Sequence, residues 1–258
     1  MVVGLILALT GAGGGILAVP LLIFGARMSV AQAGPIGLLA VGMAAALGGL
    51  LGLKSGIVRY RAALLIAAAG MVLLPVGLWL AHRTDNRWLS VIFALVLLFV
   101  AYKTYRRAAS GDEPAIRQAD PTLPCMSNAT DGRFIWTASC ARALAVTGTV
   151  AGLLSGLLGV GGGFVIVPAL RRYTNLEMQS TLATSLAVIA LVSASGVVSS
   201  ALTGAMDWTA GLPFTAGALA GMLGGRVIAS RVAGTKLQIG FAAVSALVAV
   251  GMIAKALH

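Results

Sequence analysis

The stretch GAGGGILAVP at residues 11–20 recurs as GVGGGFVIVP at residues 159–168, 148 residues further along the chain. Each copy places a run of glycines and then a proline inside apolar sequence. In a helix, glycine costs about 1 kcal/mol per position relative to alanine, and proline costs about 3 kcal/mol. At the depth of a membrane such a run predicts non-helical backbone, which is stable there only where protein covers it or where it lines a cavity.

The composition is that of an integral membrane protein. The 258 residues are 59% hydrophobic and only 10% charged, with a mean hydropathy of +0.99, whereas soluble domains are about a quarter charged. We expect an all-α fold with about eight apolar segments, most of them near the roughly 20 residues that cross a bilayer. The segments lie at residues 1–24, 30–53, 62–81, 88–102, 144–170, 182–202, 208–228 and 237–257. The first lacks a basic leading region, so we do not expect a cleaved signal peptide.

The chain is a tandem duplication. At the constant offset of 148 residues, 27 of the 100 pairs from Val2/Val150 to Ala101/Ala249 are identical, without any gap. The pairs include glycines, a proline and an arginine, which apolar composition alone does not align. The sequence therefore predicts two homologous four-segment membrane repeats, residues 1–107 and 139–258, joined by a polar, proline-containing linker at residues 108–138.

The distribution of basic residues favours inverted repeats. If each glycine segment enters the membrane and returns, each copy crosses three times, and 14 of the 18 Lys and Arg residues fall on one face. The other face then holds Arg27, Arg83, Arg87 and Lys255. Eight full crossings, with parallel repeats, would divide the charges ten to eight. Since a Lys and Arg surplus marks the cytoplasmic face, we expect inverted halves, re-entrant or broken glycine-rich helices, and a cytoplasmic linker.

Other classes of function find little support. Cys125 and Cys140 fit neither a metal pattern nor a disulfide framework, so we expect two free thiols, kept reduced in the cytoplasm. The glycine runs lack the Lys-Ser/Thr of a phosphate-binding loop, and the two histidines fit no zinc pattern. We therefore predict no enzyme activity, no cofactor and no metal site. The basic surplus lies at segment ends, which favours anchoring to anionic lipid over nucleic-acid binding.

The candidate site is the backbone of the glycine runs. Exposed N–H groups at the start of a half-helix form an anion site, which the helix dipole reinforces. Thr184 and Ser185 open the next segment of the second repeat and are candidates to line it. We interpret the later hydroxyls Ser193, Ser195 and Ser199 as packing residues. The predicted substrate-binding residues are Gly13, Gly14, Gly15, Gly161, Gly162, Gly163, Thr184 and Ser185. The alternative is that the glycines only permit close helix packing.

The doubled G-x-G-G-G-x-x-x-V-P, each followed by Leu22 or Leu170, and the downstream Ala183-Thr184-Ser185-Leu186 resemble the sulfite exporter TauE/SafE family. That family is also called the toluene sulfonate uptake permease family. The resemblance implies a plasma-membrane transporter of sulfur-containing anions such as sulfite, sulfonates or sulfoacetate. The first repeat departs from the pattern, because Pro-Ile-Gly-Leu at residues 35–38 replaces the Thr-Ser type of segment.

We therefore expect a multi-pass secondary transporter of small sulfur-containing oxyanions in the plasma (inner) membrane, working by alternating access around a midplane site. Its expected partners are the small anionic substrate and the lipid bilayer, and the sequence indicates no oligomeric state. Two alternatives stay open at this point. One is a passive anion channel, and the other is a membrane scaffold that transports nothing.

Overall fold

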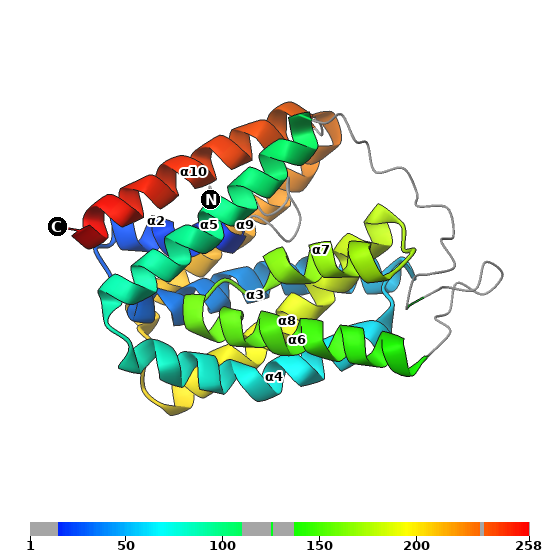
Figure 1. The fold of residues 1–258 in the computed structure, drawn as a ribbon, viewed down its shortest axis with the longest axis horizontal. Helices are drawn as coiled ribbons and strands as arrows, with labels where there is room; N and C mark the ends of the chain where they lie inside the picture. Colours follow the sequence, from blue (N-terminus) through cyan, green and yellow to red (C-terminus); the bar gives the residue numbers. More distant parts are fainter. Residues whose placement is uncertain (1–14, 110–124, 126–136, 233–234, 258) are drawn as a thin grey trace.

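The computed structural model describes residues 15–109, 125, 137–232 and 235–257, and these residues fold into helices (Figure 1). The helices are α2 (Ala18–Gly25), α3 (Val30–Lys54), α4 (Tyr60–Arg83), α5 (Asn86–Ala109), α6 (Ala138–Leu158), α7 (Gly163–Tyr173), α8 (Met178–Leu202), α9 (Trp208–Val232) and α10 (Thr235–Leu257). Five of them, α3, α4, α5, α6 and α8, are long and apolar enough to cross a membrane. The expected all-α membrane fold is confirmed.

The two ends of the bundle differ in charge. At one end α4 and α8 finish and α3 and α5 begin, and we call it the Arg83 face because it carries Arg83. At the opposite end α3 finishes and α4, α6 and α8 begin, and we call it the Arg59 face. The described basic side chains follow the division expected for inverted halves. Those at the Arg59 face include Lys54, Arg59, Arg61, Arg142, Arg171 and Arg172.

The directions of equivalent helices are those expected for inverted repeats. The helices α3 and α8 occupy equivalent positions in the two repeats and pack against each other. Gly42 of α3 faces Ser193 of α8, and Gly52 faces Ala183, so the two helices are antiparallel. The equivalent pair α5 and α10 also packs together and crosses the top of Figure 1 in opposite directions. Inverted repeats require equivalent helices that run in opposite directions, whereas parallel repeats do not.

The second glycine motif breaks the membrane segment in two. Helix α6 ends at Leu158, and α7 starts at Gly163 and runs back toward the end of the bundle from which α6 came (Figure 1). The Cys125 N–H donates to the carbonyl oxygen of Tyr173 at the end of α7, and Cys125 is also bonded to Cys140 at the start of α6. The α6–α7 segment therefore enters and returns to the Arg59 face.

The prediction of two free thiols is wrong. Cys125 and Cys140 form a disulfide with Cα atoms 4.9 Å apart, and both residues are fully buried. Sequence reasoning missed this bond because the pairing depends on the return of α7. The backbone of Cys125 pairs with Thr174 beyond the end of α7, and this contact brings Cys125 to the start of α6. Disulfides are typical of oxidising compartments, so the bond opposes the cytoplasmic location that the basic surplus favours for the linker.

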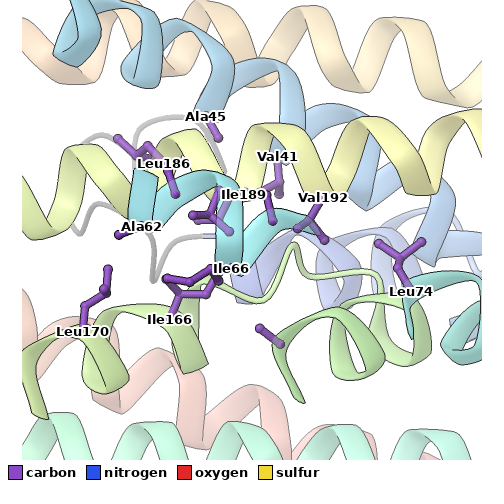
Figure 2. Packing of buried hydrophobic residues seen from close by; sticks show 14 of the residues in the cluster. Val41, Ala45, Ala62, Ile66, Leu74, Ile166, Leu170, Leu186, Ile189 and Val192 are labelled. Atoms are coloured by element: carbon purple, nitrogen blue, oxygen red, sulfur yellow. The ribbon is translucent and has the colours of Figure 1, made fainter. Parts of the chain in front are cut away.

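The apolar core has two parts. One lies between α3, α4, α6, α7 and α8, and Figure 2 shows 14 of its residues, among them Val41, Ile66 and Ile189. The other joins α2, α5 and α10 to the start of α3 and the end of α6. Large apolar side chains also lie on the outer surface, such as Trp88 of α5 and Leu247 of α10. An apolar exterior of this kind is typical of a protein whose solvent is lipid.

Candidate functional site

The second glycine motif forms a loop in a conformation that favours glycine. Gly159, Gly161 and Gly162 have φ angles of +71°, +74° and +70°. Residues with a β-carbon rarely adopt this left-handed region, whereas glycine does so without steric cost. The loop also touches α3 closely, because a β-carbon on Gly37 would lie 2.7 Å from the carbonyl oxygen of Gly159. The predicted break in the helix and its close approach to a neighbour are both present in this copy.

The two glycine motifs meet. A β-carbon on Gly15 would lie 2.9 Å from Cγ1 of Val41 and 3.2 Å from the carbonyl oxygen of Val160. A β-carbon on Gly161 would lie 3.2 Å from the same Val41 Cγ1 and 2.9 Å from Cγ2 of Ile189. Val41 and Ile189 are equivalent residues of the two repeats, at the crossing of α3 and α8.

Helix α7 presents its N-terminus to this meeting point. Its N-cap is Gly162, which has no side chain to bind the first N–H groups, and Gly163 is its first residue. The orphan N–H groups and the positive end of the helix dipole favour an anion at such a terminus.

A hydroxyl group that we had interpreted as packing lies beside the loop. Oγ of Ser193 lies 3.3 Å from the position of a β-carbon on Gly161. The residue is fully buried, and within the described part of the chain its hydroxyl has no hydrogen-bond partner. Two other serines of α8 behave differently, since Ser185 donates to the carbonyl oxygen of Leu182 and Ser195 to that of Val192. A buried hydroxyl without a partner costs free energy, so Ser193 is a donor beside the loop that a ligand could satisfy.

The structure places Thr184 and Ser185 away from the glycine loop. Oγ1 of Thr184 accepts a hydrogen bond of 3.1 Å from the N–H of Arg59, the N-cap residue of α4 at the Arg59 face. Thr184 precedes Ser193 by nine residues, or about 13 Å along a helix. Of the predicted glycines, Gly15, Gly161, Gly162 and Gly163 are brought together, whereas Gly13 and Gly14 lie outside the described residues.

The sequence holds one signal at Ser193, which is a difference between the two repeats. Ala45 stands at the equivalent position of the first repeat, so the hydroxyl belongs to one copy only. The spacing along α8 does not tell which serine bonds its own helix and which one faces the loop. That distinction depends on α3, because Gly42 lets Ser193 approach so closely that a β-carbon on Gly42 would lie 2.7 Å from Cβ of Ser193.

Known proteins resemble this chain along nearly all of its length. A family model described as Sulfite exporter TauE/SafE matches residues 1–252. A probable membrane transporter protein of Xylella fastidiosa (strain 9a5c) is 28% identical over 236 residues, covering 91% of this chain and 84% of the relative. The probable membrane transporter protein YunE of Bacillus subtilis (strain 168) is 23% identical over 235 residues, covering 88% and 85%. No solved structure matches the chain. With its apolar helices, the chain is a multi-pass membrane transporter protein and belongs to the TauE/SafE sulfite exporter family.

Proposed function

We propose that the protein is a secondary carrier of a small sulfur-containing oxyanion across the plasma membrane, with its substrate site where the two glycine motifs meet. One observation carries the proposal. The side chain of Val41 contacts both motifs, next to the buried, unpartnered hydroxyl of Ser193 and the uncapped start of α7.

The chemistry of these groups suits an oxyanion. Backbone N–H groups of the glycine loop, the positive end of the α7 dipole and the Ser193 hydroxyl are all groups that can bind negative charge. Such donors stabilise negative charge without an arginine at mid-membrane depth, where a charged side chain is costly. The family description supports sulfite and related sulfur oxyanions as the substrate class, and the names of the relatives support transport in general.

Tight packing at the site favours a carrier over an open channel. Val41 and Ile189 fill the space against Gly15 and Gly161, where even a methyl group would be crowded. A substrate therefore enters only when α3 and α8 separate. Because α3 belongs to the first repeat and α8 to the second, that separation is a movement of one half against the other, as alternating access requires.

Uptake by proteoliposomes tests the proposal. Purified protein should take up labelled sulfite or an alkanesulfonate with saturating kinetics, and the same anions should raise its melting temperature. Replacement of Ser193 by alanine should weaken anion binding by about 10- to 100-fold, because a hydrogen bond to a charged group contributes about 1.5–3 kcal/mol. The matched control is Ser195→Ala, whose hydroxyl donates to its own helix.

The outcomes separate the alternatives. If sulfite, sulfonates, sulfate and thiosulfate change neither uptake nor melting temperature, the substrate assignment is refuted. A flux that does not saturate, with single-channel currents in planar bilayers, would identify a passive channel instead. If Ser193→Ala and Ser195→Ala transport equally well, the site lies elsewhere.

A further inference from the structure

A recess opens at the Arg83 face, between the ends of α4 and α8. It consists of two adjoining pockets, of about 160 Å³ and 430 Å³, which share His82 and Ala205. The smaller pocket is lined by Leu78, Trp79, His82, Ser199, Ser200, Thr203 and Ala205. Ser200 is 2% exposed, and its hydroxyl has no hydrogen-bond partner among the residues that the structure describes. The recess therefore contains a buried polar group that only a ligand or water can satisfy.

Two leucines separate this recess from the glycine loop. Ser200 follows Ser193 by seven residues on α8, so both lie on one face of the helix, with Gly196 between them. A β-carbon on Gly196 would lie 2.8 Å from Cδ1 of Leu38 and 3.1 Å from Cδ2 of Leu74. Leu38 comes from α3 and Leu74 from α4, one turn before Leu78 in the recess wall.

The same contact occurs a second time, at equivalent residues. A β-carbon on Gly48 of α3 would lie 2.8 Å from Cδ1 of Leu186 and 3.3 Å from Cε of Met222. Gly48, Leu186 and Met222 are related to Gly196, Leu38 and Leu74 by the duplication offset of 148 residues. This second contact lies toward the Arg59 face, where α3 ends and α8 begins. The glycine-loop site thus lies between two apolar plugs, each built from one α3 or α8 leucine and one side chain of α4 or α9.

We propose that the recess is an outer binding site for the transported oxyanion, and that the two plugs are gates that open in turn. The gate at the Arg83 face is Leu38 and Leu74 on Gly196, and the gate at the Arg59 face is Leu186 and Met222 on Gly48. This inference rests on the proposed function, and it adds a second binding site and the barriers on the substrate path.

The recess offers hydrogen-bond donors to an oxyanion. The Ser200 hydroxyl is one such donor. His82 lines both pockets, but its Nδ1 donates to the carbonyl oxygen of Leu78, 2.8 Å away, so Nε2 of the neutral ring is an acceptor and donates to an oxyanion only when the ring carries a second proton. Gln32 lines the larger pocket, and its Oε1 accepts from the N–H of Ser29, so its amide N–H groups are free of that bond. The guanidinium of Arg83 lies 4.3 Å from the ring of Trp79 in the wall. Asp207 is also in the wall, but its Oδ1 accepts three hydrogen bonds at the start of α9.

Thiol accessibility tests the path. The two native cysteines are disulfide-bonded, so Ser200→Cys supplies the one thiol, and wild-type protein is the blank. In sealed spheroplasts and inverted vesicles, 2-sulfonatoethyl methanethiosulfonate should label Ser200→Cys from one face only. The rate should exceed that of Ser245→Cys by at least about tenfold, since a buried thiol reacts only through local opening. Ser245 is the matched control because it too is fully buried and unpartnered, on α10.

The gates are tested with Ser193→Cys. With both gates intact its labelling should be as slow as that of Ser245→Cys. Adding Leu74→Ala should speed labelling from the face that reaches Ser200→Cys, and adding Met222→Ala should speed it from the opposite face. Ser245→Cys combined with each gate variant must stay slow, which shows that the truncation has not unfolded the protein. Excess ethanesulfonate, against chloride of equal ionic strength, should slow the labelling of Ser200→Cys.

Each contrary result overturns a stated part. If Ser200→Cys reacts no faster than Ser245→Cys, the recess is not an entrance, and if ethanesulfonate does not protect it, the recess is not an anion site. Equal labelling from both faces in Leu74→Ala and Met222→Ala refutes the gates. If the two gate variants speed labelling of Ser193→Cys from opposite faces while proteoliposomes transport no sulfur oxyanion, the proposed path is supported and the proposed substrate is refuted.

Discussion

Gly152 of α6 lies directly against Gly70 of α4, and a β-carbon on Gly152 would overlap the carbonyl group of Gly70. The contact continues along both helices, because Gly148 faces the carbonyl of Ile66 and Gly156 faces that of Leu74. These pairs show that α4 and α6 run parallel with their backbones in contact, as small residues permit between membrane helices. Since α4 belongs to the first repeat and α6 to the second, the glycine loop at the end of α6 is attached to a helix of the other half.

Replacement of Gly152 by alanine should therefore destabilise the protein. The added methyl group has no space, and overpacking of this kind costs about 1–3 kcal/mol. The matched control is Gly224→Ala in α9, where a β-carbon would meet nothing within 4 Å and alanine is the better helix former. Thermal unfolding in detergent should show a lower melting temperature for Gly152→Ala and an unchanged or higher one for Gly224→Ala. Equal melting temperatures would contradict the backbone contact.

The left-handed backbone of the glycine loop leads us to expect that alanine at Gly162 lowers both stability and transport. Alanine there must adopt a φ of +70°, at a cost of about 1–2 kcal/mol, and its β-carbon would lie 2.8 Å from the carbonyl oxygen of Ala151. Gly56→Ala is the control, because Gly56 has the same φ and open space around it. Both variants should melt at a lower temperature than wild type, and the decrease should be larger for Gly162→Ala than for Gly56→Ala. Only Gly162→Ala should abolish uptake by proteoliposomes at matched protein content. Normal uptake by Gly162→Ala would show that the glycine loop is not part of the substrate site.

Much of the architecture could be predicted because local features determine it. Helix propensity alone indicates that the run ending at Gly163 cannot continue a helix, and α6 does end at Leu158. Hydropathy indicates long apolar helices, and five of the described helices are long and apolar enough to cross a membrane. These signals are properties of neighbouring residues, so a single sequence contains them.

The details that sequence reasoning missed depend on contacts between distant segments. Thr184 is a predicted site residue because it follows the motif, and in the fold its Oγ1 accepts a hydrogen bond from the N–H of Arg59 at the far end of α8 from the loop. Ser193 is interpreted from sequence as packing, and in the fold Gly42 on α3 lets it lie beside Gly161 of the glycine loop, where we propose the substrate site. The disulfide was missed for the same reason, because Cys125 reaches Cys140 only after α7 has returned to the start of α6.

If the disulfide forms, removing either cysteine or both should lower the melting temperature equally. Cys125→Ser, Cys140→Ser and the double substitution should lower the melting temperature by the same amount, because each removes one and the same bond. For a separation of 15 residues, the loss of loop closure in the unfolded chain amounts to about 3 kcal/mol. Wild-type protein treated with reductant should match the variants. If reductant leaves the melting temperature unchanged and mass tagging finds two free thiols before reduction, the bond does not form in the protein.

The hydrogen bonds to the carboxylate of Asp207 lead us to expect that the stability of the protein depends on pH. Its carboxylate accepts hydrogen bonds from the Thr209 hydroxyl at 2.6 Å and from the N–H groups of Thr209 and Ala210. The Thr209 hydroxyl, followed by the Ala210 N–H, holds the pKa of Asp207 below its ordinary value of 3.8. The charged form is therefore favoured by folding, so its contribution to stability is present above pH 3.8 and is lost as the pH falls through the lower folded pKa.

Asp207→Ala should melt at a lower temperature than wild type at pH 7, and the difference between the two melting temperatures should narrow in acid. Thr209→Val should show part of the same loss, because it removes the largest cause of the shift. Melting curves of the three proteins at neutral and acidic pH decide the matter, and a gap that is constant with pH would show that the carboxylate does not stabilise the start of α9.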